Sequence, residues 1–471
     1  MPVAIDRIQD PAVIAGYLSD ASNLHGHATD LVRPKSSDDI AEILAHCQEN
    51  EIPITVSAQR TSTTGGPVPF GGWILSMEKL DKLLWQKGAR ARIQAGAILG
   101  EFQEEMLRHG WMFPPDPTSR HECTIGAAIA CNASGAKSYR YGPTRPWIES
   151  IEVILPTGEK REISREDPIP EEWPKTDWNP PDVKSAAGYI PTNNLLDLFI
   201  GQEGTLGIIS EATVRLIPAP KEIFSLLCFF PDIESTLGFV QKLRDCSPDK
   251  DLTTPSSIEF YGPNAVDLIR GKIGTLSSTA RFGIWCEQDT NPDSIDAELE
   301  AWLDLLDGSE ALVEESVFAQ DDAGRRKLAD MRHAVPAGIN EQVVANGMPK
   351  LGTDCSVPHE ALGEMVEAYL SVPIDHVLFG HIGDSHLHLN MLPKSKEELE
   401  KAKAIYRSLC TKAVALGGSV SAEHGIGKIK KAHFADMVGP EVLDRFRCLK
   451  TTLDPHWILG RGNLFDPKNP K

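Results

Sequence analysis

The sequence predicts an α+β fold built from two to four domains. Short apolar runs of strand length alternate with helix-like apolar patterns along the chain. Its 471 residues suggest several domains at about 100–200 residues each. The hydrophobic fraction of 41% and the charged fraction of 24% are those of ordinary globular domains, which argues against a disordered or fibrous chain.

The first third of the chain alternates strands with helices. Ser37-Asp38-Asp39 precedes four apolar residues that share one face of a capped helix, which are Ile40, Ile43, Leu44 and Cys47. We expect a short helix after the second of the strands over 52–56, 73–77 and 91–95. Further strands are expected over 151–155, turned by Pro156-Thr157-Gly158, and over 208–217.

A break at Pro218-Ala219-Pro220 separates a second α+β pattern from the first. Strands are expected over 223–230 and 281–286, and helices over 233–244 and 294–306. Nearer the C-terminus, Ser395 and Glu398 form a capping-box pattern before a long apolar stripe, which Gly417-Gly418 ends. The chain therefore reads as more than one domain.

The charge excludes several classes of partner. The net charge of −20 leaves no basic footprint for a phosphate backbone, so nucleic acid is not expected as a partner. The same charge opposes binding to an anionic membrane surface. No apolar run approaches the length of a membrane span, and the first residues lack the pattern of a secretory signal.

The nine cysteines predict a reducing compartment. They are scattered, and no C-x-x-C pair occurs, so a cysteine-ligated zinc or iron–sulfur site within the chain is not expected. We therefore expect a cytoplasmic protein.

Two segments rich in small residues, 56–66 and 124–135, could surround an extended anion. Such loops let backbone N–H groups approach a phosphate, and Ser and Thr hydroxyls add donors. Tight turns and close packing would explain either segment alone equally well. Neither segment contains the dinucleotide or P-loop glycine pattern.

Taken together and in order, these segments resemble the flavoprotein superfamily of vanillyl-alcohol oxidase and p-cresol methylhydroxylase. The matching motifs are Thr-x-x-x-Gly-Gly at 61–66, Pro-x-Asp-Pro at 114–117, Thr-Ile-Gly…Asn-Ala-x-Gly at 124–135, Tyr-Gly at 141–142 and Gly-x-Glu-Gly-Thr-Leu-Gly at 201–207. The last motif is the most specific, because every fixed position matches immediately before a predicted strand.

The resemblance implies that the chain binds FAD. Because the first loop lacks the histidine that some members bond to the flavin, non-covalent FAD is expected. The cofactor-binding residues implied are Arg60, Thr61, Ser62, Thr63, Thr64, Gly65, Gly66, Pro115, Asp116, Thr124, Gly126, Asn132, Ser134, Gly135, Tyr141, Gly142, Glu203, Gly204, Gly207 and Ile208.

The same resemblance implies the domain organisation. Residues 1–218 would form a PCMH-type FAD-binding domain of two subdomains. Residues 219–425 would form an α+β, ferredoxin-like cap domain that carries the substrate and metal site. Residues 426–471 would form a helical segment that packs back on the FAD domain.

A second constellation is rich in histidine. The segment Gly380-His381-Ile382-Gly383-Asp384-Ser385-His386-Leu387-His388-Leu389-Asn390 precedes Ser421-Ala422-Glu423-His424-Gly425. If 385–390 is a strand, His386, His388 and Asn390 share one face, and the Gly-Asp turn can bring His381 back to it. Imidazole and carboxylate suit a divalent metal, although ordinary strand and loop histidines are the alternative.

These two motifs resemble one branch of the superfamily, which includes D-lactate dehydrogenase, the catalytic subunit of glycolate oxidase and D-2-hydroxyglutarate dehydrogenase. The likeness implies that His381, His388 and Glu423 bind a divalent metal, with zinc expected first and iron or manganese as alternatives. It implies that His424 is the catalytic base, and we assign Asn390 to the catalytic group. Many relatives carry Asn where this chain has His386, which leaves the role of His386 open.

The expected reaction is the oxidation of a D-2-hydroxy acid to the 2-oxo acid. A metal ion chelated by the hydroxyl and carboxylate lowers the hydroxyl pKa, and a histidine can accept the proton. Arg332 stands where relatives place a substrate arginine, whose fork suits a carboxylate. Lys350 does not have the spacing expected for a hydroxyglutarate enzyme, which favours D-lactate or glycolate.

Electrons would pass on to a separate acceptor, either a quinone or a protein such as an electron-transfer flavoprotein or an iron–sulfur subunit. Such a partner would allow a peripheral position at the inner membrane, and a homodimer is left open. Three alternatives remain: a zinc hydrolase, which would be colourless, a non-redox synthase on the same flavin fold, and a flavin subunit without turnover of its own.

Overall fold

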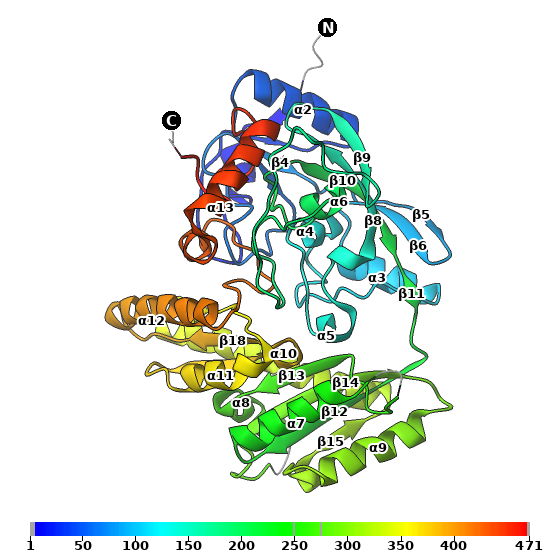
Figure 1. Ribbon diagram of the computed structural model, residues 1–471. Helices are drawn as coiled ribbons and strands as arrows, with labels where there is room; N and C mark the ends of the chain where they lie inside the picture. Colours follow the sequence, from blue (N-terminus) through cyan, green and yellow to red (C-terminus); the bar gives the residue numbers. More distant parts are fainter. Residues whose placement is uncertain (1–4, 248–249, 274–275, 469–471) are drawn as a thin grey trace.

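The computed structural model describes residues 5–247, 250–273 and 276–468 and confirms the α+β class. The N-terminal half holds two main β-sheets, and a third and larger sheet lies in the other half of the molecule (Figure 1). The chain between β11 (Ile217–Pro218) and β12 (Glu222–Phe230) passes from one half to the other, at the proline-rich break.

The first sheet has four strands in the order β1-β2-β4-β3. β2 (Asp30–Val32) and β3 (Ile54–Ser57) pair in parallel with β4 (Trp73–Ser76), and β1 (Arg7–Ile8) is antiparallel to β2. The helices of this part are α1 (Pro11–Ala15) and α2 (Ser37–Glu49). Helix α2 begins as expected, except that Ser36 is the cap: its side chain accepts from Asp39 N, and Asp39 reaches back to the backbone of Ser36.

The second sheet has five antiparallel strands in the order β5-β6-β10-β8-β9. Their bounds are β5 (Leu83–Lys87), β6 (Arg90–Gln94), β8 (Ile148–Ile154), β9 (Lys160–Ser164) and β10 (Ile208–Arg215). The short helix α4 (Ile125–Ala130) packs on β6 and β10, with the side chain of Thr124 accepting from Ala127 N. The other elements here are α3 (Leu99–Arg108), β7 (Trp111–Met112), α5 (Ser138–Tyr141), η1 (Arg145–Trp147) and α6 (Leu195–Phe199).

The prediction of a short helix after residues 73–77 is wrong. That segment instead leads into β5, which forms a hairpin with β6. Gly88 lies in the turn at a φ of 55°, a conformation that glycine adopts without strain. Leu83, Leu84 and Trp85 stay largely exposed. Strand pairing with β6, rather than burial of an apolar helix face, therefore fixes this segment.

The third sheet has seven strands in the order β15-β12-β14-β13-β17-β18-β16, all antiparallel. Its remaining strands are β13 (Ser257–Tyr261), β14 (Phe282–Thr290), β15 (Val317–Ala319), β16 (Leu351–Gly352), β17 (His376–His381) and β18 (His386–Met391). The helices are α7 (Ile233–Asp245), α8 (Pro263–Ile273), α9 (Ile295–Asp307), α10 (Asp322–Asn346) and α11 (Leu362–Leu370), with η2 (Val313–Glu315) and η3 (His359–Ala361).

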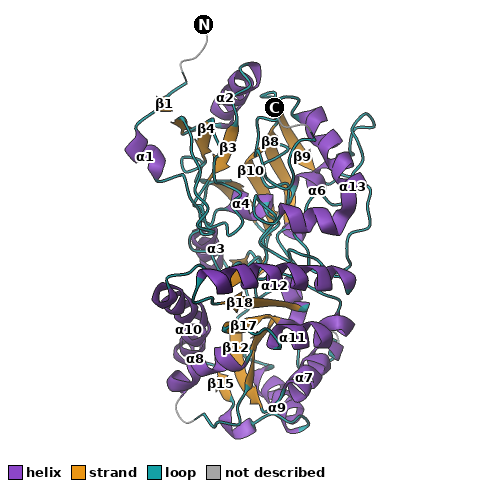
Figure 2. Ribbon diagram, turned by 90° about the vertical axis from the view of Figure 1, so that its left-hand side faces the viewer, coloured by secondary structure: helices purple, strands orange, loops and turns teal. Residues whose placement is uncertain are grey.

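Helices cover both faces of this sheet (Figure 2). Phe224, Leu226, Cys228 and Phe230 of β12 belong to the same core as Phe239 of α7 and Trp302 of α9. The residues between them, Leu227 and Phe229, belong to a second core with α8 and α10. Alternate residues of β12 thus point to opposite faces and both faces are buried, which explains why apolar residues predominate on both faces of this strand.

The C-terminal part returns to the N-terminal half. Helix α12 (Lys396–Ala415) lies across the middle of the molecule, and α13 (Lys431–Leu453) lies beside the first two sheets (Figures 1 and 2). Beyond α13, the backbone of Ile458 accepts from Ile54 N at 2.7 Å. Lys450 of α13 donates to the carbonyl of Thr205 at 2.5 Å. The segment between α12 and α13 is therefore held between the two halves of the molecule.

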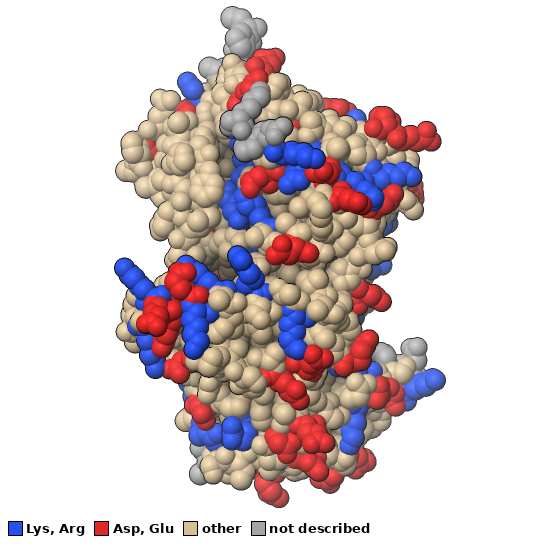
Figure 3. All heavy atoms as spheres, turned by 60° about the vertical axis from the view of Figure 1, so that its left-hand side comes forward, with Lys and Arg blue, Asp and Glu red and all other residues tan. Residues whose placement is uncertain are grey.

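Charge is mixed on the molecular surface. On the face drawn in Figure 3, Lys and Arg side chains alternate with Asp and Glu side chains, in keeping with the net charge of −20. Among the helices of the described residues, none has the length and hydropathy needed to span a bilayer.

Candidate active site

A cavity of about 670 Å³ lies where the two small-residue segments meet the last turn before α13. The predicted cofactor residues that line it are Arg60, Thr61, Ser62, Thr63, Gly66, Thr124, Gly126, Ser134, Glu203, Gly204, Gly207 and Ile208. Segments far apart in the sequence thus form one continuous wall.

The other predicted cofactor residues do not line the cavity. They are Thr64, Gly65, Pro115, Asp116, Asn132, Gly135, Tyr141 and Gly142. A Cβ added to Gly135 would lie 1.7 Å from Asp116 O, so only glycine allows the second segment to pack on the Pro-x-Asp-Pro motif. Asn132 Oδ1 accepts from Arg145 N, and the hydroxyl of Tyr141 donates to Asp289.

The same cavity reaches the histidine-rich site, because Glu423 and His424 also line it. The hydroxyl of Ser134, in the second small-residue segment, donates to Glu423 Oε2 at 3.3 Å. Thr64 Oγ1, in the first segment, donates to the carbonyl of His424 at 3.4 Å. The two constellations found in the sequence are therefore parts of one site.

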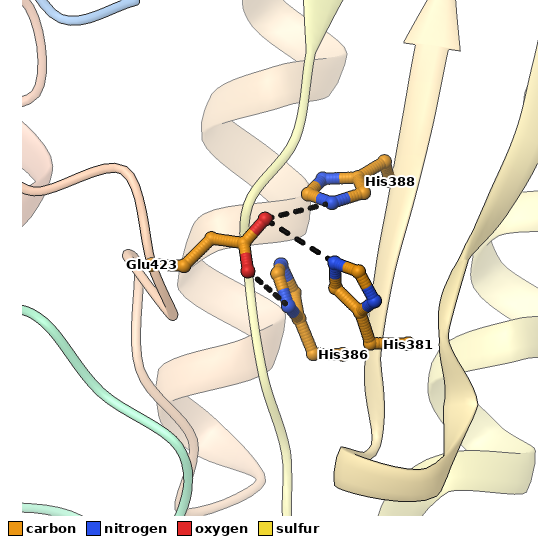
Figure 4. Close-up of side chains that lie close together, drawn as sticks. All are labelled: His381, His386, His388 and Glu423. Atoms are coloured by element: carbon orange, nitrogen blue, oxygen red, sulfur yellow. Dashed lines mark ion pairs between the residues drawn. The ribbon is translucent and has the colours of Figure 1, made fainter. Parts of the chain in front are cut away.

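The histidines come together through a β-hairpin. β17 ends at His381, η4 (Ile382–Asp384) turns the chain, and β18 begins at His386, directly opposite His381. His386 and His388 are two positions apart on β18 and so share one face, as expected from the sequence. All three imidazoles point toward Glu423 (Figure 4).

The inner atoms of this cluster lie close together. Glu423 Oε1 is 3.4 Å from His381 Nε2 and 3.3 Å from His388 Nε2. Glu423 Oε2 is 3.9 Å from His386 Nδ1. One ligand atom from each of these four residues lies within 4.8 Å of all the others. The predicted ligands His381, His388 and Glu423 are thus brought together, and His386 joins them.

Each imidazole has an acceptor near its outer nitrogen. His381 Nδ1 is 2.6 Å from Glu259 Oε1, and His388 Nδ1 is 3.2 Å from the carbonyl of Thr353. His386 Nε2 is 2.9 Å from Asp354 Oδ1, although its N–H is not aimed well enough for a regular hydrogen bond. An acceptor on the outer nitrogen favours the tautomer whose inner nitrogen carries a lone pair, which is the form that binds a metal.

Burial and charge act differently on these groups. Burial lowers the pKa of His381, but the carboxylates of Glu259 and Glu423 outweigh it and raise that pKa to about 9. Burial and the neighbouring His388 lower the pKa of His386 to about 3. Against the effect of burial, Lys184 and the histidines hold the pKa of Glu423 well below its usual range.

A buried lysine, Lys184, pairs with two carboxylates of the site. Lys184 Nζ lies 3.2 Å from Glu423 Oε2 and 3.3 Å from Asp384 Oδ2, and its side chain is only 7% exposed. Glu423 therefore presents Oε1 to His381 and His388, while Oε2 faces Lys184 and the hydroxyl of Ser134.

His424 lies between the histidine cluster and the cavity. Its ring stacks on His388, with the centroids 5.3 Å apart and the planes at 15°. Its backbone N–H donates to Asp354 Oδ2 at 3.0 Å, which fixes the turn. Burial lowers the pKa of His424 to about 4, so the imidazole is neutral at neutral pH.

The predicted residues Arg332 and Asn390 do not line the cavity. Arg332 of α10 contacts Glu259, the carboxylate that pairs with His381. Its guanidinium is 3.5 Å from Glu259 Oε2 and lies over the ring of Trp285. Asn390 is buried on β18, on the face shared by His386 and His388. Lys350 directly precedes β16, which pairs with β18.

Three residues of the site are absent from the sequence-based set, namely Lys184, Glu259 and Asp354. Glu259 is the only charged residue in the apolar strand Ser257–Tyr261, and a lone carboxylate in a buried strand is the signal that could have found it. Asp354 is fully buried and accepts from Lys430, Ser421 and the backbone of His424. Lys184 lies in the loop between β9 and α6, where the sequence carries no comparable signal.

The residues fit both groups that the sequence implies. The four cluster residues supply three imidazoles and a carboxylate, a donor set suited to a divalent transition metal. The cavity wall combines hydroxyls and backbone amides with close glycine contacts, as binding of a pyrophosphate requires. A Cβ on Gly126, for example, would lie 2.6 Å from the side chain of Ala95.

Comparisons with known proteins support the FAD assignment. Residues 219–464 match the family of FAD linked oxidases, C-terminal domain, and residues 29–164 match an FAD binding domain family. The chain is 29% identical over 467 residues to glycolate oxidase subunit GlcD of Bacillus subtilis, covering 95% of this chain and 92% of that protein.

Two further relatives carry different substrate names. A D-lactate dehydrogenase of Anaerostipes hadrus is 28% identical, covering 95% of this chain and 92% of that protein. A D-2-hydroxyglutarate dehydrogenase of Xanthomonas citri pv. viticola is 27% identical, covering 92% and 88%. Among solved structures, an alkyldihydroxyacetonephosphate synthase superimposes with a TM-score of 0.69 at 17% identity, covering 98% of this chain and 82% of that one, and this likeness concerns the fold alone.

Proposed function

Because the chain belongs to the family of FAD-linked oxidases, and is an FAD-dependent hydroxy-acid dehydrogenase, we propose that it oxidises a small D-2-hydroxy acid with the help of a divalent metal ion. D-Lactate and glycolate are the favoured substrates, and the products are the corresponding 2-oxo acids. The metal ion, the substrate and the electron acceptor are the parts that go beyond the family assignment.

One observation carries the proposal. The hydroxyl of Ser134, on a wall of the FAD-side cavity, donates to Glu423 of the histidine cluster at 3.3 Å. Cofactor loops and metal ligands therefore meet at one point, and a substrate held by the cluster would face the cavity that His424 also lines. Such convergence is what transfer between a chelated substrate and a flavin requires.

The FAD would be held by the 60–66 loop, by Thr124, Gly126 and Ser134, and by the 203–208 turn. When bound, FAD accepts the hydride that leaves the substrate carbon. The chain contributes the shape of the cavity and the donors of its wall, which orient the cofactor and exclude water.

The divalent ion would be held by His381, His388 and Glu423, and when bound it lowers the pKa of the substrate hydroxyl. The carboxylates and carbonyl behind the imidazoles fix the orientation of these ligands. His424 accepts the hydroxyl proton on its imidazole, next to His388 and at the wall of the cavity.

The charges at the cluster favour a substrate with one carboxylate. Arg332 is paired only loosely, at 3.5 Å from Glu259, and its guanidinium can serve as the carboxylate anchor. Lys184 and Lys430, which also lie at the cluster, are each already paired with buried carboxylates. Asn390, on the ligand-bearing face of β18, is a further candidate for substrate contact.

A separate acceptor would take the electrons from the reduced flavin. In the described residues, no cysteine belongs to a cluster of metal-ligating side chains, and all nine cysteines are free. A protein partner, either an electron-transfer flavoprotein or an iron–sulfur subunit, or a quinone would therefore complete the turnover. We propose a cytoplasmic enzyme that reaches the inner membrane only through such a partner.

The test is the anaerobic visible spectrum of the metal-loaded protein before and after each hydroxy acid is added. Bleaching of a yellow protein by D-lactate or glycolate, and not by the L-isomers or D-2-hydroxyglutarate, is the expected result. Bleaching by D-2-hydroxyglutarate alone would overturn the choice of substrate. A flavin that no hydroxy acid reduces would favour the synthase alternative, and a protein that stays colourless with added FAD would favour the hydrolase.

A further inference from the structure

His386 occupies a position that the metal site assigned above does not use. Its side chain is fully buried, with its ring centroid 4.5 Å from that of His388 and 5.4 Å from that of His381. In Figure 4 it lies beside His381 and below His388 and points at the same carboxylate. A histidine that served only to fill space here could be replaced by an apolar side chain without leaving nitrogen atoms in the interior.

The two nitrogens of His386 have different surroundings. Nε2 lies 2.9 Å from Asp354 Oδ1, and the other oxygen of this carboxylate pairs with the ammonium of Lys430 at 2.6 Å, which keeps the carboxylate anionic. The anionic oxygen favours the proton on Nε2. Nδ1 then carries a lone pair that faces the cluster, and it has no hydrogen-bond partner among the described residues.

We propose that His386 is a fourth protein ligand, through Nδ1, to the divalent ion held by His381, His388 and Glu423. The inference rests on the proposed function, because it presupposes the metal site. One ligand atom from each of the four residues lies within 4.8 Å of the others, and Nδ1 is 3.9 Å from Oε2, the outer oxygen of the Glu423 carboxylate. Ligands bound at about 2.0–2.2 Å from one ion lie about 3–4 Å apart, so the widest pair would have to close by about 1 Å on metal binding.

The arrangement of Glu423 agrees with a site that has three imidazoles. Lys184 and the hydroxyl of Ser134 both engage Oε2, at 3.2 and 3.3 Å. Oε1 is left as the oxygen that His381 and His388 approach, so Glu423 would bind through one oxygen. One carboxylate oxygen and three imidazole nitrogens make four protein donors.

Four protein donors restrict the choice of metal. They would saturate a tetrahedral zinc ion, which needs an open position for catalysis. A six-coordinate ion would keep two positions free, and the hydroxyl and carboxylate of a 2-hydroxy acid need two. The donor set therefore points to Mn²⁺, Fe²⁺ or Co²⁺ as the working ion instead of zinc.

The test counts imidazole ligands by X-ray absorption on the FAD-loaded protein that carries Mn²⁺ or Co²⁺. We expect three imidazoles in the wild type and two in His386→Asn, with FAD still bound. Competition with a chelator should show at least about ten-fold weaker metal binding in His386→Asn. His376→Asn is the matched control, because His376 lies at the far end of β17 and bonds to the carbonyl of Ile374.

Three outcomes would overturn the inference. Two imidazoles in the wild type would show that His386 is not a ligand, whether or not the variant folds. An equal imidazole count in the wild type and His386→Asn would lead to the same conclusion. A wild-type protein that binds FAD but retains neither ion against the chelator would remove the metal site itself, and with it the metal-assisted part of the proposed function.

Discussion

Glu203 accepts a hydrogen bond of 2.7 Å from the backbone N–H of Gly427, although the two residues lie 224 positions apart. A second bond of the same length comes from Ile426 N. Glu203 belongs to the turn before β10, whereas Gly427 follows Glu423 and His424. One buried carboxylate therefore joins the wall of the cavity to the segment that carries the proposed metal ligand and the proposed base.

Replacement of Glu203 by Gln should weaken this junction. The amide can accept only one of the two backbone bonds and turns an N–H₂ group toward the other donor, which we expect to lower the free energy of unfolding by about 1–3 kcal/mol. FAD affinity should fall with it. Urea unfolding and FAD titration would measure both effects, with the exposed Glu314→Gln as the control.

The effect of Glu203 on stability should depend on pH. Burial raises the pKa of Glu203 to about 7 from its usual 4.5, despite the two backbone bonds. The folded state therefore binds the proton more tightly than the unfolded state, so the stabilisation is present below pH 4.5 and is lost as the pH rises to about 7. The stability difference between wild type and Glu203→Gln should accordingly shrink over this interval; a difference that grows would contradict the assignment.

Lys184→Met should be among the most destabilising single changes at the site. It leaves Glu423 and Asp384 without the buried ammonium that lies within 3.3 Å of both, and an unpaired buried charge costs about 3–5 kcal/mol. Thermal and urea unfolding would measure the loss. Lys175→Met, in the exposed part of the same loop, should leave stability unchanged.

Glu259→Gln should weaken metal binding although Glu259 is not a proposed ligand. The carboxylate lies 2.6 Å from His381 Nδ1, and loss of such a partner typically lowers metal affinity by about 10–100-fold. Because Glu259 also lies 3.5 Å from Arg332, KM for the hydroxy acid should change as well. Chelator competition and steady-state kinetics separate the two effects, and unchanged affinity would exclude Glu259 from orienting His381.

His424→Ala should slow reduction of the flavin by substrate by about 10²–10⁴-fold, the usual contribution of a general base. FAD and metal content should stay at the wild-type level. Anaerobic stopped-flow absorbance would give the rate, with the exposed His109→Ala as the control. Retention of the full rate would remove His424 from the mechanism.

His388→Ala should lower metal content and activity together, since Nε2 lies 3.3 Å from Glu423 Oε1 within the cluster. Wild-type protein treated with a chelator should lose activity in the same way and recover it when the ion is returned, whereas the variant should not recover. Metal analysis alongside activity would check this, and normal metal stoichiometry in the variant would argue against His388 as a ligand.

Much of the fold could be predicted from local pattern, because strong patterns leave little choice. The capped helix α2, the turn after β8 and the largely apolar β12 follow the sequence closely. The segment at 83–87 did not, since its leucines and tryptophan suit a helix face as well as a strand, and only pairing with β6 decides between them. Local sequence does not encode a partner strand.

Some residues of the candidate site could be predicted from the sequence and others could not. Histidines and a glutamate clustered in two short motifs could be found, because several ligands on one hairpin leave a dense signal. Asp354 and Lys184 could not, because each is a single charged residue whose partner lies far away in the chain, and the lone carboxylate of Glu259 in its apolar strand signals burial without naming its partner. Their roles follow from tertiary contacts, which spacing along the sequence does not describe.

The hairpin of β17 and β18 has a consequence beyond bringing the imidazoles together. Side chains change face at every residue of a strand, so a slip of one position would carry His386 and His388 to the far side of the sheet at once. The arrangement of the proposed metal ligands therefore depends on the backbone pairing of the two strands as well as on the side chains themselves. Deletion of Leu387 would place His386 and His388 on opposite faces of the sheet with all three histidines still present in the chain.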